Sequence, residues 1–141
     1  MTLRPYAVVI DGDLEFGIEL IQNQGKIVEI RPHTGPAEPY VISKAFINAH
    51  SHLEYRGLQG VISQTQYWPW IRELTQLKRA QDLSEVRKDC LRAAQENKAT
   101  GVSHIAEHSD RPYAAEAIAN TGLKGIVFQE LITVLEQDSR L

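Results

Sequence analysis

From residue 45 onwards the sequence alternates short apolar runs with longer stretches of helical periodicity. The expected strands are an apolar segment that leads into Phe46-Ile47, the segment Val102 to Ala106, and the near-continuous apolar run from Leu123 to Leu131. Between them, apolar residues recur at three- and four-residue spacings, which indicates amphipathic helices. The order strand, helix, strand, helix, strand with apolar strands is typical of a parallel sheet covered by helices. This order predicts an α/β fold for residues 44–141.

The helices of this part have local start and stop signals. One is expected to begin near Pro69, because proline suits the first turn. Another follows Asp82-Leu83-Ser84-Glu85, which has the form of a capping box, and stops at Thr100-Gly101. A third follows Asp110 to Pro112 and stops at Asn120-Thr121-Gly122. The pattern of residues 133–137 allows the start of one more helix.

Two kinds of side chain within these helical patterns are expected to pack in the core. The first is the aromatic group Tyr67, Trp68 and Trp70, which has helical spacing; its alternative role is to cap a planar substrate. The second is the single cysteine, Cys90, for which a ligand role is the alternative.

Residues 1–43 predict part of a small antiparallel β domain. Turn residues at Asp11-Gly12-Asp13 and Asn23-Gln24-Gly25 separate β-prone runs. The expected strands are Tyr6 to Ile10, Leu14 to Ile21, Lys26 to Ile30 and Tyr40 to Ile42.

The composition excludes several classes of partner. The net charge is −3 over 141 residues, and no basic cluster is present to neutralise nucleic-acid phosphates. No segment approaches the roughly 20 apolar residues that span a bilayer, so a membrane is not expected as a partner. The amino terminus has no long apolar region of the secretory kind, and the single cysteine excludes an intrachain disulfide. Together these features predict a cytoplasmic protein.

A pair of histidines, His50 and His52, stands where the first strand of the α/β part ends. On a strand, residues i and i+2 point to the same face, with Cα atoms roughly 6.6 Å apart. Two imidazoles at that spacing can converge on one metal ion, and imidazole suits zinc and iron(II). The carboxyl ends of parallel strands are where α/β enzymes place their chemistry. The alternative interpretation is that both are ordinary residues of a half-buried strand.

A second histidine pattern, His104-Ile105-Ala106-Glu107-His108, formally matches the H-x-x-E-H motif of zinc peptidases. That motif requires a helix, so that the histidines lie one turn apart. Here the segment follows Gly101-Val102 and is predicted to be a strand. On a strand, His104 and His108 would lie roughly 13 Å apart, so we expect no shared metal ion.

The segment Ala45-Phe46-Ile47-Asn48-Ala49-His50-Ser51-His52-Leu53-Glu54 resembles the first-strand motif of the amidohydrolase superfamily, in particular its deaminase and chlorohydrolase branch. The similarity covers nearly the whole chain but only about the first third of such an enzyme, a barrel of eight strands. It continues through Leu58, Gly60, Trp68 to Arg72, Gly101 to Ser103 and Gly125 to Glu130.

This resemblance implies a fold and a chemistry. Residues 44–141 would be the first three β/α units of a metal-dependent (β/α)8 barrel, here incomplete, and residues 1–43 the flanking β domain. His50 and His52 would be two ligands of a divalent metal, zinc or iron, that activates water for attack on a heterocyclic ring carbon. Ammonia or chloride then leaves. The remaining ligands and the catalytic glutamate of the family lie on later strands, so they are expected beyond Leu141.

Three further residues are candidates for contact with substrate: Glu54, His108 and Glu130. Glu54 follows the metal motif, and its alternative role is to anchor the loop. His108 ends the second strand, and its alternative is a solvent-facing loop position; Glu107 is a similar candidate. Glu130 closes the third strand, where the resembled family often has a glutamate. The substrate implied is a heterocyclic amine; the Leu53-Glu54 pair favours purine-like or aminofutalosine-like deaminases, with chlorohydrolases and cyclic amidases left open.

Three strands of a barrel would have unpaired apolar edges, and two histidines do not supply the three protein ligands of a catalytic zinc site. We therefore expect no turnover by this chain alone, and a complementing chain or a homo-oligomer is the candidate partner. The alternative function is that of a non-catalytic fragment or interaction module with a relic metal motif.

Overall fold

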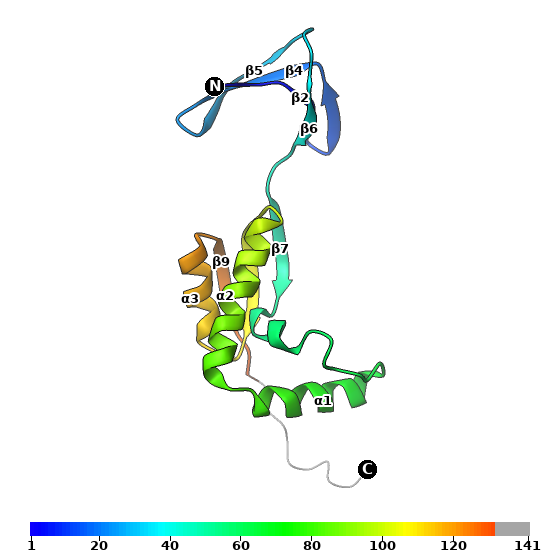
Figure 1. Ribbon diagram of the computed structural model, residues 1–141, viewed down its shortest axis with the longest axis vertical. Helices are drawn as coiled ribbons and strands as arrows, with labels where there is room; N and C mark the ends of the chain where they lie inside the picture. Colours follow the sequence, from blue (N-terminus) through cyan, green and yellow to red (C-terminus); the bar gives the residue numbers. More distant parts are fainter. Residues whose placement is uncertain (132–141) are drawn as a thin grey trace. The chain divides into compact units, whose positions relative to one another are not determined.

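The computed structural model describes residues 1–131, which divide into two units between Lys44 and Ala45 (Figure 1). We call residues 1–44 unit 1 and the residues from Ala45 onwards unit 2. The helix start expected within residues 133–137 lies outside the described residues. The interpretation of the two units as part of a β domain and part of a barrel stays a prediction at this stage. No described helix has the length and apolar character needed to cross a membrane.

Unit 1 consists of two three-stranded sheets. Their strands are β1 (Thr2–Leu3), β2 (Pro5–Ile10), β3 (Asp13–Phe16), β4 (Ile18–Asn23), β5 (Lys26–Pro32) and β6 (Glu38–Ile42). One sheet has the order β1-β4-β5 and is antiparallel throughout; the other has the order β3-β2-β6. The strands enclose a small core in which Ala7, Val8 and Leu20 are buried.

Two features of unit 1 differ from the sequence-based prediction. The strand expected over Leu14 to Ile21 is broken at Gly17, where φ is 64°, a left-handed conformation that glycine adopts without steric cost. The break lets β3 pair with β2 and β4 pair with β5, in different sheets. In addition, β6 pairs with β2 in parallel, so unit 1 is not wholly antiparallel. Strands β3 to β5 provide the crossover connection that a parallel pair requires.

A buried carboxylate links the strands of unit 1 to its amino-terminal segment. Glu19 lies between two guanidinium groups, with Arg4 Nε at 2.9 Å and Arg31 Nε at 2.6 Å from its oxygens. These two hydrogen bonds hold the pKa of Glu19 below its usual range. Because both partners donate to it, the carboxylate is satisfied although its side chain is almost fully enclosed.

Unit 2 contains a three-stranded parallel sheet, as the alternating pattern predicts. Its strands are β7 (Phe46–Ser51), β8 (Val102–Ser109) and β9 (Lys124–Gln129), in the order β7-β8-β9. The parallel pairing of β7 with β8 and of β8 with β9 requires crossover connections, which the helices supply. In this sheet, strands that follow one another in the sequence are neighbours in space.

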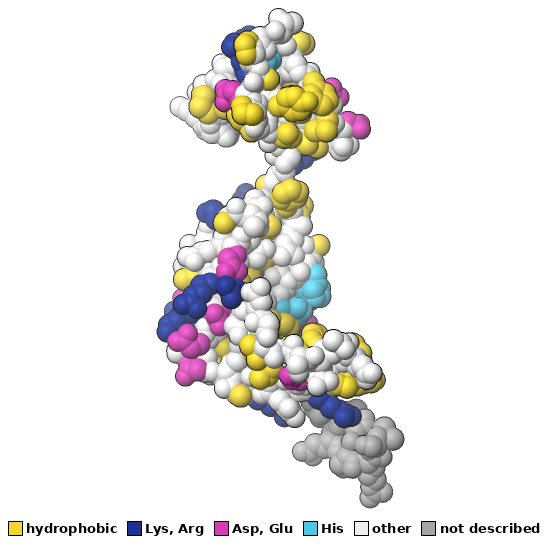
Figure 2. Space-filling model, turned by 45° about the vertical axis from the view of Figure 1, so that its right-hand side comes forward, with side chains coloured by type: hydrophobic (Ala, Val, Ile, Leu, Met, Phe, Trp, Pro, Cys, Tyr) yellow, Lys and Arg dark blue, Asp and Glu magenta, His cyan; other side chains and the backbone are white. Residues whose placement is uncertain are grey.

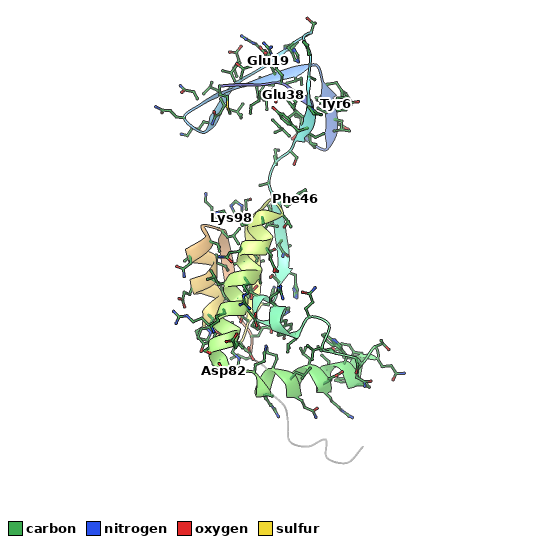
Figure 3. All side chains as sticks on the ribbon, in the orientation of Figure 1. Tyr6, Glu19, Glu38, Phe46, Asp82 and Lys98 are labelled. Carbon is green, nitrogen blue, oxygen red and sulfur yellow. The ribbon has the colours of Figure 1, made fainter. Side chains whose placement is uncertain are left out.

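The helices of unit 2 are α1 (Tyr67–Ala80), α2 (Leu83–Ala99) and α3 (Tyr113–Thr121), with a 3-10 helix, η1 (Leu53–Leu58), directly after β7. Asp82 caps α2 by accepting hydrogen bonds from the backbone N–H groups of Ser84 and Glu85, as expected from the capping box. Near the other end of α2 (Figure 3), Lys98 donates to the Thr121 carbonyl at the end of α3. The hydrogen bond from Lys98 joins α2 to the end of α3.

Helices α2 and α3 cover one face of the sheet, and the hydrophobic core of unit 2 lies between them (Figure 1). The core residues are Leu53, Val86, Cys90, Ala93, Ala94, Ile105, Ala114, Ala117, Ile118 and Leu123. Cys90 is fully buried, which confirms its packing role, and burial raises the pKa of its thiol to about 12. The many alanines allow α2 and α3 to approach the sheet and each other closely.

The expectation that the aromatic group of α1 packs in a core is wrong for two of its members. Tyr67 is 65% exposed and Trp68 is 68% exposed, whereas Trp70 is half-buried. The buried residues of α1 are Leu74 and Lys78, in its second half. The first turn of the helix therefore lies beyond the described part of the core, and helical spacing alone does not reveal this.

Candidate functional site

A bulge at the end of β7 turns both histidines of the motif toward one face of the sheet. Asn48 pairs with Ile105 and Ser51 pairs with Glu107, so a step of three residues in β7 matches a step of two in β8. The extra residue changes which side chains face the helices. Asn48 bonds to Asn97 of α2, on the helix side. His50 and His52 instead lie with His108 on the opposite face.

We call this second face of the β7-β8-β9 sheet the open face. It carries alternate residues of each strand, among them Ile47, His108, Ile126 and Phe128. Ile47 is 71% exposed and Ile126 is 62% exposed, so the described residues leave this face uncovered. Figure 2 shows histidine side chains gathered on one side of unit 2.

The two histidines of the motif converge at their Nε2 atoms, which lie 3.1 Å apart. Two nitrogen ligands of a tetrahedral zinc ion, each about 2.0–2.1 Å from the metal, lie roughly 3.3 Å apart. The observed separation therefore fits two ligands of one ion. The two Nε2 atoms are also within hydrogen-bond distance of each other, and the tautomers of the two rings decide which one donates. The pair has the geometry that its sequence spacing predicts.

Aromatic rings hold the histidine pair on both sides. His50 stacks on His108, with ring centroids 4.3 Å apart, and His108 stacks in turn on Phe128 at 4.9 Å. These three rings come from β7, β8 and β9 in order. On the other side, the Tyr55 ring is parallel to the His52 ring, with an interplanar angle of 5° and a centroid distance of 4.6 Å. The rings restrict the orientations open to both imidazoles.

Glu130 follows β9 and lies near the far nitrogen of His52. Its Oε2 atom is 3.9 Å from His52 Nδ1, and its backbone N–H donates to the Ser109 carbonyl at 2.9 Å. His52 Nδ1 is buried and has no hydrogen-bond partner among the described residues. A carboxylate near this nitrogen favours the tautomer that keeps its proton on Nδ1 and leaves Nε2 free as a ligand.

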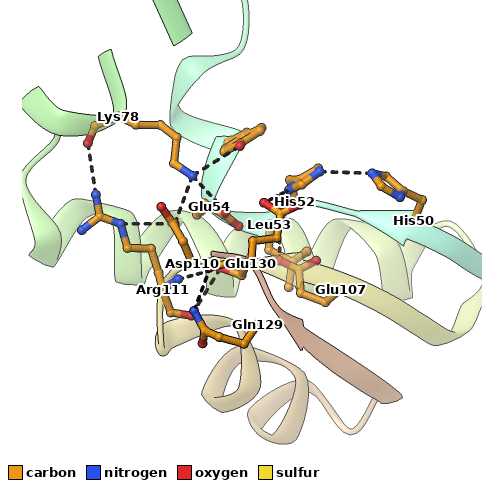
Figure 4. A network of polar contacts seen from close by, with 12 residues as sticks. His50, His52, Leu53, Glu54, Lys78, Glu107, Asp110, Arg111, Gln129 and Glu130 are labelled. Carbon is orange, nitrogen blue, oxygen red and sulfur yellow. Dashed lines mark hydrogen bonds and ion pairs between the residues drawn. The ribbon is translucent and has the colours of Figure 1, made fainter. Parts of the chain in front are cut away.

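A buried charged cluster lies on the side of η1, next to His52 (Figure 4). Glu54 is fully buried, and its Oε1 atom is 3.5 Å from Lys78 Nζ. The same ammonium donates to Asp110 Oδ1 at 3.0 Å and to the Tyr55 hydroxyl at 3.3 Å. Burial lowers the pKa of Lys78, but the hydrogen bonds with Asp110 and Tyr55 outweigh burial, so the net direction is upward. The cation therefore stays charged and neutralises the buried Glu54 carboxylate.

Glu107 is a second fully buried carboxylate, and it holds the backbone beside the histidines. Its Oε1 atom accepts a hydrogen bond from the Leu53 backbone N–H at 2.8 Å. Burial raises the pKa of Glu107 to about 7, against the effect of the hydrogen bonds from Leu53 and Ser51. Sequence reasoning considered Glu107 only beside His108. The missed signal is its alternation with buried Ile105, which places Glu107 on the helix-covered face.

The structure brings four predicted site residues together: His50, His52, His108 and Glu130. Glu54 lies apart from the open face, in the buried cluster with Lys78. His104 lies in β8 and not in a helix, which removes the basis of the H-x-x-E-H interpretation. Within residues 1–131, no group of three or more His, Cys, Asp or Glu side chains is arranged to hold a metal ion. The ligand role of His50 and His52 and the substrate roles of Glu54, His108 and Glu130 stay predictions.

The fold of this chain is similar to that of three solved enzymes. It matches aminofutalosine deaminase from Helicobacter pylori, in complex with methylthio-coformycin, with a TM-score of 0.73 and 16% identity, over 97% of this chain and 36% of that one. An amidohydrolase from Brucella melitensis matches with a TM-score of 0.62 and 15% identity, over 89% of this chain and 34% of that one. A mutant atrazine chlorohydrolase from Arthrobacter aurescens, complexed with zinc and atraton, matches with a TM-score of 0.65 and 13% identity, with the same coverages of 89% and 34%.

These three proteins are the kinds of enzyme that the sequence motif resembles, a deaminase, an amidohydrolase and a chlorohydrolase. At these identities the likeness shows the fold. The chain spans about a third of the length of the structures it matches. No protein-family model matches the sequence, and no curated protein matches it.

Proposed function

We propose that this chain is the amino-terminal part of a metal-dependent amidohydrolase of the deaminase and chlorohydrolase branch. Unit 2 then corresponds to the first three β/α units of a barrel and unit 1 to part of the flanking β domain. The reaction is hydrolysis of a C–N or C–Cl bond on an amino-substituted heterocycle. Deamination is the favoured form, because an aminofutalosine deaminase is among the solved structures with the same fold.

The observation that carries this proposal is the convergence of His50 and His52. Their Nε2 atoms lie 3.1 Å apart, at the carboxyl end of a parallel strand and on the open face. One of the solved structures with a similar fold, the mutant atrazine chlorohydrolase, is complexed with zinc. The carboxyl ends of parallel strands are where barrel enzymes assemble their sites from several loops.

In this proposal His50 and His52 hold a divalent ion, with zinc favoured and iron as the alternative. The ion supplies Lewis acidity that activates water and polarises the substrate. Glu130 stabilises the proton on His52 Nδ1, while His108 stacks on the His50 ring and is itself stacked on Phe128. Turnover requires a third protein ligand and a catalytic acid and base, which further strands of a barrel would supply.

Metal binding by the 141-residue chain tests the proposal directly. Titration calorimetry with Zn²⁺, and the visible spectrum with Co²⁺, should detect about one ion per chain. His50→Ala and His52→Ala should each weaken binding by more than the roughly 10- to 100-fold that loss of an outer-sphere partner costs. His104→Ala is the matched control, because His104 lies on β8 away from the pair, and it should bind like the wild type.

The alternative function, an interaction module with a relic motif, makes the opposite prediction. Wild-type chain that binds neither Zn²⁺ nor Co²⁺, or that binds them equally well after His50→Ala, would contradict the metal-site proposal. The uncovered open face would then be the feature that remains to be explained, and pull-down of a partner chain would be the next measurement.

A further inference from the structure

Lys78 is a buried cation whose place in the proposed site is not explained by metal binding or by chemistry at the substrate. It lies in α1 and is 5% exposed, which is unusual for a lysine. Its ammonium donates hydrogen bonds to Asp110 at 3.0 Å and to Tyr55 at 3.3 Å, and it forms an ion pair with Glu54 Oε1 at 3.5 Å (Figure 4). Two hydrogen bonds and one ion pair restrict the movement of this group.

Tyr55 connects this cation to the histidine pair. Its hydroxyl accepts the hydrogen bond from Lys78 Nζ, and the same nitrogen lies 4.6 Å from the centre of the Tyr55 ring. The ring is stacked in parallel on the His52 imidazole at 4.6 Å. Because the ligand nitrogen lies in the plane of the imidazole, the tilt of the Tyr55 ring also sets the direction of His52 Nε2.

We propose that Lys78 is a positioning residue of the metal site, which holds the Tyr55 ring against His52 and so fixes the direction in which His52 presents Nε2. This inference rests on the proposed function, since it assumes that His52 is a ligand. The physical reason is that a metal site requires its ligands within about 10–20° of the productive orientation. A stacked ring anchored at its hydroxyl provides such a restraint from outside the coordination sphere.

A purely structural role for Lys78 is the competing explanation, because Glu54 is buried beside it and requires a counter-charge. In that case the loss of Lys78 destabilises the fold without affecting the metal affinity of the folded chain. The two explanations also differ in their dependence on Tyr55. A role through the ring disappears when the ring is absent, whereas charge neutralisation does not.

A double-mutant cycle on the 141-residue chain separates the explanations. Zn²⁺ affinity is measured by competition with a chromophoric chelator for the wild type, Lys78→Met, Tyr55→Leu and the double variant. Lys78→Met should weaken Zn²⁺ binding about 10-fold, and it should have no further effect in the Tyr55→Leu background. Lys88→Met, an exposed lysine of α2, is the matched control and should bind like the wild type.

Two additional measurements distinguish an effect on the metal site from a loss of folding. Glu54→Gln combined with Lys78→Met removes both buried charges together, and this variant should fold and still show the roughly 10-fold loss. In the metal-free chain, the ring-current shift that Tyr55 causes on the His52 ring protons should decrease in Lys78→Met by NMR. This shift reports the stacking itself.

The outcomes distinguish the two proposals. Wild-type chain that does not bind Zn²⁺ overturns the proposed function. Wild-type chain that binds Zn²⁺, with unchanged affinity and unchanged His52 shifts in Lys78→Met, overturns the positioning role of Lys78 alone. Additive losses in the cycle also overturn it, because Lys78 and Tyr55 would then act independently.

Discussion

Glu107 shows how a single buried residue couples the histidine segment to the neighbouring strand. Its carboxyl group accepts the hydrogen bond from the Leu53 N–H, the first peptide after His52, and is completely enclosed. Enclosure disfavours the charged form, which raises the pKa to about 7. Glu107 therefore titrates near neutral pH. The free energy of unfolding should change with pH in this range.

The sign of this response follows from the direction of the pKa change. In the folded chain Glu107 binds its proton more tightly than in the unfolded chain, where its pKa is near the usual 4.5. Its contribution to the free energy of unfolding is therefore present in full below about pH 4.5 and is lost as pH rises through about 7. Glu107→Gln stays neutral and lacks this dependence.

The free energy of unfolding, measured with urea between pH 4.5 and pH 8, is the readout for Glu107. The difference between wild type and Glu107→Gln should fall across this window by on the order of 3 kcal/mol or less. Comparison with the variant cancels the titration of the other groups. Parallel pH profiles for the two chains would show that Glu107 keeps an ordinary pKa.

At the scale of the elements, the packing of β9 against β8 depends on one glycine. Gly125 pairs with Ile105, which is buried beneath α2 and α3. A Cβ atom at residue 125 would overlap the carbonyl oxygen of Ile105 and lie 2.8 Å from its Cγ2 atom. The glycine is therefore required for a close approach of two backbones, and a positive φ plays no part.

Gly125→Ala should destabilise unit 2 by about 1–3 kcal/mol, because β8 and β9 must separate or Ile105 must change rotamer. Thermal unfolding of the variant, followed by circular dichroism, measures the loss. Lys124→Ala is the matched control, since residue 124 is exposed on the open face, and it should unfold close to the wild type. Equal midpoints for Gly125→Ala and the control would contradict the close approach.

At the scale of the whole molecule, the sheet of unit 2 has two edge strands in the part of the chain that is described. Each of β7 and β9 pairs only with β8, and both carry exposed apolar side chains, among them Phe46, Ile47, Ile126 and Phe128. Unpaired edges and an apolar open face favour association with another chain. The same surface would be covered in a complete barrel.

The 141-residue chain should therefore self-associate in a concentration-dependent way. Sedimentation velocity at increasing concentration should show a rising average mass, and Ile47→Lys with Ile126→Lys should reduce it. Leu83→Lys is the control, since Leu83 is exposed on α2 and not on the sheet. A single monomeric species at all concentrations would show that the open face and the edges do not drive association.

Much of unit 2 could be predicted from local patterns. The capping box at Asp82, the glycines that end α2 and α3, and the apolar run of β9 all act on their immediate neighbours in sequence. The two-residue period of a strand predicts that His50 and His52 point to the same side, whereas the bulge in β7 decides which face of the sheet that is. The break of the expected strand at Gly17 also has a local signal in the sequence, because a glycine inside a strand pattern often marks an interruption of the strand.

The sequence by itself determined the α-helices and the parallel strands of unit 2, and the pair of histidines at the end of its first strand. Only the tertiary structure decided that Glu54, Lys78 and Glu107 are buried, that Tyr67 and Trp68 are exposed, and that a bulge at the end of β7 redirects its side chains. Periodicity and caps are properties of neighbouring residues. Burial and side-chain partners depend on what packs opposite, because a charged residue becomes stable inside the fold only when distant segments supply its counter-charge and hydrogen bonds.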